Sequence, residues 1–369
     1  MTRTTSLLLL SVLLALAGLA TGASAEQPTA IKYVVTLSTE TMAMPFAMPN
    51  IPGMANIPGL ADMFKPKRVI TGLAEYAVPA VEPIFVGVPG DLKLPQNKLV
   101  LTVDKPTPPG PDTPAEPGTT EPAKPTKMTM TMKLYWHPDV AEGPVTNTLD
   151  VDSSRMPTAP QGRGPATMDW SRLAEEFDKT AAGSNDKLPE KVVGAGDYVL
   201  NTGGFTATLA GFLPPLKITA PETLADVDPA AGFELTWEPV AGARGFIIQI
   251  TGMENHPAQG TTPQSMTIYQ WVSSTVEPPE RVRHDYEQAT TIADDLDKGI
   301  LLPAETLSCV VPPNVFPTDV PMLTVNVVAV GADFYNQAGT TTVVGKIRSR
   351  WTGMKMSMAG MPGMPPAEE

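Results

Sequence analysis

The chain has 369 residues, of which 42% are hydrophobic, so it can form sizeable cores and is not a disordered polymer throughout. Its formal net charge is −13 at pH 7. Binding nucleic acid or anionic lipid requires Lys and Arg to neutralise phosphates, so this charge argues against both as partners. The single cysteine, Cys309, excludes an internal disulfide, and we expect it to be a buried core side chain.

The first 25 residues have the pattern of a secretory signal peptide. Arg3 supplies a short basic region, residues 7–19 form an apolar core, and residues 23–25 (Ala-Ser-Ala) are a small-x-small cleavage site. We expect cleavage at this site to give a mature chain that begins at Glu26. The loss of Arg3 changes the formal net charge from −13 to −14. No later apolar run approaches the roughly 20 residues of a membrane span. We expect an exported protein, periplasmic or secreted, with no transmembrane segment after signal cleavage; an uncleaved N-terminal anchor is the alternative.

Residues 26–215 are predicted to form an N-terminal β-rich domain. Runs rich in β-branched and alternating residues predict strands, and a strand pair is expected around the Gly203-Gly204 turn. The expected strands are 31–39, 68–78, 98–103, 127–137 and the pair within 194–213. Residues 168–179 have apolar side chains at helical spacing and predict one short helix in this half.

Two biased segments interrupt this half. Residues 41–64 are rich in Met, Pro and Gly, which predicts a long irregular loop. Residues 105–127 hold eight prolines and predict an extended polyproline-like segment, either an interdomain linker or a loop within one sheet.

The region 216–352 is predicted to form a second domain, with its boundary at Pro214-Pro215. The stretch 233–253 reads as two alternating strands, the first with Leu-x-Trp at 235–237, joined by a turn with Pro and Gly. Further strands are expected over 216–220, 266–273, 306–311, 322–330 and 340–348. A charged insertion, residues 274–303, is expected to hold a short helix that ends at Gly299, which explains its acidic run better than a calcium loop does.

The Leu-x-Trp strand, its turn and the alternating valines of 323–330 resemble a fibronectin type III or immunoglobulin-like β-sandwich. Leu323 stands where that family carries its corner tyrosine, so the hydrogen bond of that corner is expected to be absent. The resemblance covers the C-terminal half and implies a β-sandwich there. For the whole chain we expect an all-β fold with two β-sandwich-like domains, one short helix in the N-terminal half and a charged insertion in the C-terminal sandwich. Residues 353–369 are expected to be a flexible Met/Pro/Gly tail.

Four other runs resemble an uncharacterised family of secreted bacterial proteins. They are residues 128–143, 271–274, 301–316 and 348–356. Where that family has a Cys-containing turn after a Tyr-Trp pair, this chain reads Tyr135-Trp136-His137-Pro138. The resemblance implies export and a two-part β architecture, and it implies no chemistry.

Methionine is the compositional outlier, with 19 residues, 13 of them in clusters at 42–63, 128–132 and 354–364. Thioethers suit Cu(I), and M-x-M spacing brings two sulfurs to one ion. The candidate Cu(I) ligands are Met42, Met44, Met354, Met356 and Met358. The competing interpretations are core packing for the 128–132 cluster, and adaptable apolar contact or oxidant capture for the other two.

Motifs for hydrolases, metalloproteases and phosphate binding are absent from the sequence, and its three histidines lack metal-ligand spacing. The sequence therefore favours no cofactor and an exported, non-catalytic β-sandwich protein that binds a protein or envelope partner or has a structural role. A Met-rich periplasmic protein that handles Cu(I) is the alternative. A hydrolytic or carbohydrate-active enzyme is the third hypothesis.

Overall fold

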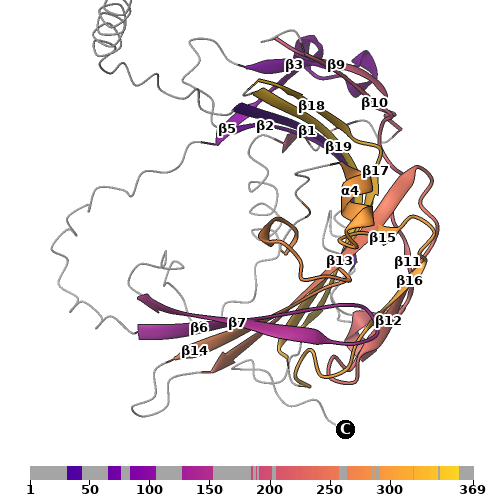
Figure 1. Cartoon of the computed structure of the whole chain (residues 1–369). Helices are drawn as coiled ribbons and strands as arrows, with labels where there is room; N and C mark the ends of the chain where they lie inside the picture. The colour runs from indigo at the N-terminus through magenta and orange to yellow at the C-terminus, as the bar shows by residue number, and fades with distance from the viewer. Residues whose placement is uncertain are drawn as a thin grey trace, which may run out of the picture.

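The computed structural model is all-β, as the sequence predicts (Figure 1). It describes residues 31–43, 65–75, 84–104, 127–152, 184–185, 188, 191–201, 205–256, 264–283, 286, 291–318, 320–339 and 341–356. The predicted helix over 168–179, most of the 41–64 loop and nearly all of the 105–127 segment lie outside these residues. No helix of the described segments is long and apolar enough to cross a membrane.

One twelve-stranded sheet dominates the fold. Nine strands follow one another across it in the order β5 (Thr102–Asp104), β2 (Lys67–Glu75), β1 (Ile31–Met42), β19 (Thr341–Met356), β17 (Met322–Gly331), β13 (Ala243–His256), β14 (Ser265–Val272), β6 (Lys127–Trp136) and β7 (Glu142–Asp152). Three short strands pair alongside: β8 (Ser184–Asn185) with β2, β15 (Leu302–Pro303) with β13, and β18 (Phe334–Ala338) with β19. Figure 1 shows the sheet curving from β1 and β2 at the top to β6 and β7 at the bottom.

Strands from both predicted domains share this sheet. The unit β19-β17-β13-β14 comes from the C-terminal half and is antiparallel within itself. On one side β1 adds to β19 in parallel, and on the other β6 adds to β14 in parallel. The predicted boundary at residue 215 therefore does not separate two sheets.

A second, three-stranded sheet packs on one face of the C-terminal unit. It consists of β11 (Ile218–Ala220), β12 (Phe233–Trp237) and β16 (Ser308–Val311). The alternation of β12 buries Leu235 and Trp237, and the Trp237 ring lies 5.3 Å from that of Phe246 on β13. We call this the sandwich face of the main sheet; Phe246, Ile248, Val325 and Val327 point from it into the core.

A four-stranded sheet covers the N-terminal end of the assembly. Its strands are β10 (Thr206–Leu209), β9 (Gly196–Leu200), β3 (Phe85–Gly87) and β4 (Lys98–Val100). Two 3₁₀ turns, η2 (Gly90–Leu92) and η3 (Pro95–Asn97), connect β3 to β4. The sheet approaches β19 so closely that a Cβ atom added to Gly345 would lie 2.5 Å from a Leu209 methyl carbon. The glycine at this position permits the contact.

The opposite side of the C-terminal unit, which we call the insertion face, holds a second core. Ile247, Val272, Val328 and Val330 point to it and pack against residues of the charged insertion. The insertion contains η6 (Glu280–Val282) and the single α-helix of the described residues, α4 (Ile292–Asp297). As predicted, a glycine terminates this helix: Gly299 follows the C-cap residue Lys298, and its φ of 68° is left-handed.

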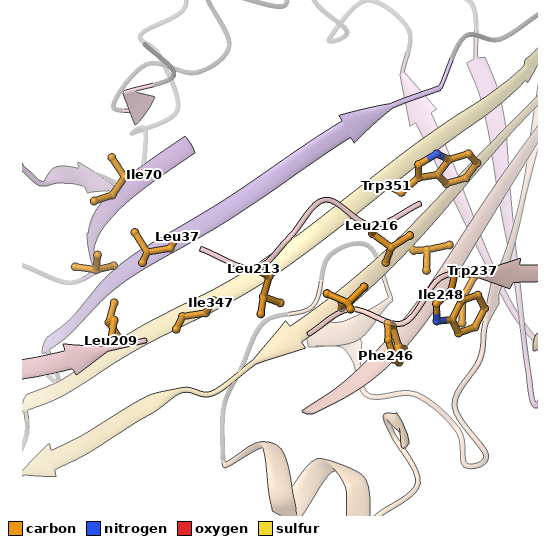
Figure 2. Close-up of a cluster of buried hydrophobic side chains, with 14 of the residues drawn as sticks. Leu37, Ile70, Leu209, Leu213, Leu216, Trp237, Phe246, Ile248, Ile347 and Trp351 are labelled. Carbon is orange, nitrogen blue, oxygen red and sulfur yellow. The ribbon is translucent and has the colours of Figure 1, made fainter. Parts of the chain in front are cut away.

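The connection at Pro214-Pro215 is packed into the main core (Figure 2). Leu213 and Leu216 are 5% and 0% exposed and lie among side chains of both halves. The Thr39 hydroxyl of β1 donates to the Leu213 carbonyl oxygen at 2.6 Å, and the Leu216 N–H donates to Ser349 Oγ of β19 at 3.0 Å. The segment is thus fixed to two adjacent strands of the sheet, β1 and β19.

Several strands differ from the sequence prediction. The predicted strand 98–103 is two strands, β4 and β5, which pair in different sheets. The predicted tail begins inside β19, which continues through residues 353–356. Strands β7 and β18 were not predicted, because their polar composition and the Gly and Pro of β7 give no clear buried alternation.

The Leu216→Ala variant tests whether the connection is part of the core. Removing a fully buried leucine side chain should lower the free energy of unfolding by about 2–5 kcal/mol. Leu307→Ala, at a leucine that is 41% exposed, should change it by less than about 1 kcal/mol. Urea unfolding followed by circular dichroism measures both; equal small effects would mean that the connection is a solvated linker.

Candidate functional site

The structure places three of the predicted Cu(I) ligands on one face of the main sheet. Met42 ends β1 and is 37% exposed, while Met354 and Met356 lie half-buried near the end of β19. Met42 pairs with Thr352, two residues before Met354, so all three side chains belong to the insertion face. Met44 and Met358 lie outside the described residues.

The third methionine cluster lies farther along the same face. Met130 and Met132 are half-buried on β6, separated from β19 by three strands. Packing was expected to bury this cluster in a core, and Leu134 of the same strand is indeed only 2% exposed. The two methionines are less completely covered than that leucine, because they lie beyond the core that the insertion forms.

Two further methionines, which the sequence analysis did not single out, complete the pattern. Met356 pairs directly with Met322 of β17, and Met322 pairs directly with Met253 of β13. We call these three residues the methionine row. Neither Met253 nor Met322 belongs to a sequence cluster, so only the strand register could have identified them.

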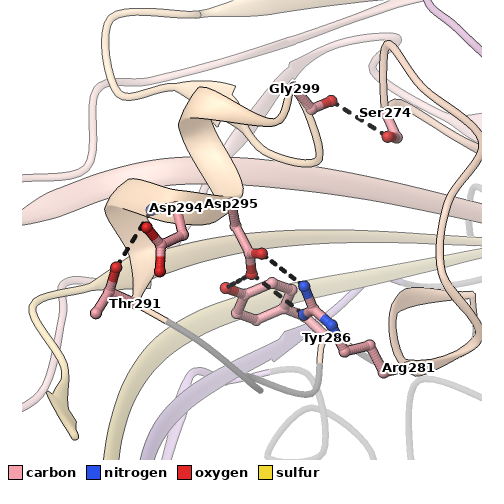
Figure 3. Close-up of polar contacts among 7 residues, drawn as sticks. All are labelled: Ser274, Arg281, Tyr286, Thr291, Asp294, Asp295 and Gly299. Atoms are coloured by element: carbon pink, nitrogen blue, oxygen red, sulfur yellow. Dashed lines mark hydrogen bonds and ion pairs between the residues drawn. The ribbon is translucent and has the colours of Figure 1, made fainter.

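The charged insertion carries a buried ionic cluster (Figure 3). Asp295 of α4 is 0% exposed and receives both arms of the Arg281 guanidinium: Nη2 lies 2.5 Å from Oδ1 and Nη1 lies 3.1 Å from Oδ2. The Tyr286 hydroxyl donates to Asp295 Oδ2 at 2.7 Å. This arrangement supplies the bidentate partner and extra hydrogen bond that a buried carboxylate requires.

Burial raises the pKa values of two groups at this cluster, Tyr286 and Asp333. Burial and the hydrogen bond to Asp295 raise the pKa of Tyr286 far above its usual value, so its hydroxyl stays a donor. Burial also raises the pKa of Asp333, with a further contribution from the negative charge of Asp295. The Tyr286 hydroxyl therefore remains a hydrogen-bond donor to Asp295, and with the Arg281 pair it makes the cluster a structural clamp within the insertion.

Hydrogen bonds attach the insertion to the main sheet. The Gln249 side chain of β13 donates to the Val282 carbonyl oxygen at 2.6 Å. The hydroxyl of Ser274 donates to the Gly299 carbonyl oxygen at 3.2 Å, and the Thr275 N–H donates to the same oxygen at 2.8 Å. In its described parts the insertion thus packs against the main sheet and is hydrogen-bonded to it.

Cys309 is buried on β16, opposite Leu235, and is 5% exposed. Burial raises the pKa of its thiol from 9.0 to about 12. The expected core location is confirmed, and the thiol is neutral at physiological pH. Within the described residues, no group of three or more His, Cys, Asp or Glu side chains is arranged to hold a metal ion.

Comparison with known proteins gives no relative from which a role could be transferred. No family model matches the chain, and no curated protein or solved structure matches it significantly.

The Asp295→Asn variant should lower the free energy of unfolding by about 3–5 kcal/mol, because it removes the buried carboxylate that the half-buried Arg281 guanidinium binds with both arms. Asp294→Asn is the matched control, since the neighbouring residue of the same helix is exposed and should change stability by less than about 1 kcal/mol. Denaturant unfolding of both variants measures the difference. Similar curves for the two variants would contradict the clamp.

Alkylation of the thiol tests the burial of Cys309. The native protein should react with iodoacetamide far more slowly than the protein in guanidinium chloride, because both burial and protonation protect the sulfur. As the pH rises, the Cys309 thiol ionises at a lower pH in the unfolded chain than in the native protein. Through this group the free energy of unfolding therefore falls between pH 9.0 and about 12. Cys309→Ala should remove that part of the pH dependence. Equal alkylation rates for native and denatured protein would contradict this account.

Proposed function

We propose that this chain is an exported, non-catalytic β-sandwich protein that binds a partner in the cell envelope or the extracellular space. The leader pattern of residues 1–25 supports export, and the acidic charge supports a partner other than nucleic acid. The fibronectin-like arrangement of the C-terminal strands supports a binding module, because such sandwiches bind through exposed edges and end loops.

The observation that carries this proposal is the open edge of β7. This eleven-residue strand ends the main sheet and pairs on one side with β6; among the described residues no strand pairs with its other side. Residues 142–149 are all exposed, and Val145 and Leu149 are 41% and 61% exposed on the same face. An unpaired strand with apolar side chains is a template for strand addition.

The sequence of this edge makes strand addition favourable. Residues 145–149 (Val-Thr-Asn-Thr-Leu) contain no charged side chain and no proline. Native edges that avoid pairing usually carry Lys, Pro or a bulge within the strand. In β7, Pro144 and the irregular register lie at the start of the strand, before this run. The partner that fits this edge is an extended polypeptide segment with apolar residues at alternate positions.

Export is tested by the mass of the protein recovered from the envelope and the medium. A mature N-terminus at Glu26 supports the proposal. A full-length chain that remains in the cytoplasm contradicts it.

Binding is tested by partner capture from envelope extract, with the wild-type chain compared with the Val145→Lys/Leu149→Lys double variant. Charges on the edge should abolish capture of the specific partner, because lysines disfavour strand addition. The matched control is Val199→Lys, because Val199 is 46% exposed and lies on β9 of a different sheet. This variant should capture the partner as the wild type does. If the double variant captures the same proteins as the wild type, partner binding at the β7 edge is contradicted.

A further inference from the structure

Three methionines form a row across three adjacent strands. Met356 of β19, Met322 of β17 and Met253 of β13 are directly opposed in the two antiparallel ladders. Directly opposed residues place their side chains on the same face, here the insertion face. The next strand continues the row with Ile268, and the one after it with Met132.

The three sulfur atoms are within reach of one ion. Neighbouring strands lie about 4.8 Å apart, so the outer two methionines flank Met322 at about that distance on either side. The methionine side chain is unbranched and has three rotatable bonds, which lets the outer sulfurs swing toward the central one. Met354, two residues from Met356 on the same face, lies next to the row.

Among the described residues, the side chains next to the row on the insertion face are neutral. The charged neighbours in sequence alternate to the sandwich face, where Lys355 donates to the Ala225 carbonyl oxygen and Glu254 accepts from the Tyr269 hydroxyl. Toward the centre of the sheet, the row is followed on its own face by Thr324 and Thr251, which pair with each other. All three methionines are half-buried, so their thioethers are partly shielded from water and still accessible.

These features select one kind of metal ion. Among the described residues no carboxylate or imidazole shares the insertion face next to these neutral thioethers. Such a set suits a soft monovalent ion, whereas calcium, magnesium and zinc require oxygen, nitrogen or thiolate ligands. Burial of apolar surface alone does not explain why methionine occupies these three positions, because β-branched and aromatic side chains fit a half-buried strand face better than methionine does.

We propose that Met253, Met322 and Met356 form a Cu(I)-binding site on the insertion face of the main sheet. The proposal is independent of partner binding at β7, which lies three strands from Met253 in the same sheet. It assigns ligands that come together through the fold, whereas the M-x-M runs of the sequence need no fold to bind copper.

The test is an anaerobic titration of the full mature chain with Cu(I) in competition with a chromogenic chelator. Met322→Leu removes the central sulfur while keeping a side chain of similar volume. It should weaken the tightest binding by roughly tenfold or more, because even the loss of an outer-shell partner of a metal costs about that much. Met253→Leu and Met356→Leu should each weaken it in the same direction.

Met132→Leu is the matched control, since it is half-buried on the same face two strands beyond Met253. It should bind Cu(I) as the wild type does, and unfolding curves should show that all four variants are folded. Zn²⁺ offered in place of Cu(I) should not shift the methionine ε-methyl resonances of the row. Wild-type affinity in Met322→Leu, or equal weakening in Met132→Leu, would overturn the proposal.

Discussion

The parallel pairing of β1 with β19 is the interaction on which the rest of the molecule depends. It extends over twelve residue pairs, from Ile31 and Thr341 to Met42 and Thr352. The other edge of β19 is shared by β17 and β18, so β19 is paired on both sides over residues 341–345 and 348–352. Without β1, a sixteen-residue strand would present an open edge, which is a template for aggregation.

This pairing also explains why the connection between the halves is buried. Thr39 of β1 and Ser349 of β19 are 1% and 0% exposed, and their hydroxyls hold the backbone of Leu213 and Leu216. These contacts join segments more than a hundred residues apart in the sequence. Because loop closure must precede such contacts, we expect folding to be slow and to require the C-terminal strand to be complete.

The individual strands were largely predictable and their pairing was not. The alternation in residues 233–253 identified β12 and β13, and the LTVNVVAV run at 323–330 identified β17, because one buried face gives a period of two. Period-two patterns say nothing about which strands are neighbours. The two parallel joins, and the row of Met253, Met322 and Met356, exist only in the register of distant segments.

Local composition does not reveal how two segments pack. Pro214-Pro215 predicted a domain boundary because proline disfavours regular structure, and in the structure the flanking leucines of this segment are buried in the core. Their backbone is held by Thr39 and Ser349, which are distant in the sequence. The charge of the insertion is visible in the sequence, whereas the pairing of its Asp295 with Arg281 and Tyr286 depends on how that segment folds.

The most direct test of the shared sheet is a disulfide cross-link between β1 and β19. Lys32 and Thr342 are paired in the register, both are half-buried, and paired strands bring Cα atoms within the range that a disulfide spans. In a Cys309→Ala background, Lys32→Cys/Thr342→Cys should form an intramolecular disulfide on mild oxidation, which peptide mapping would identify. Lys32→Cys/Thr352→Cys places the second thiol about 33 Å farther along β19 and should not cross-link. Equal cross-linking of the two pairs, or none in either, would contradict the parallel pairing of β1 with β19.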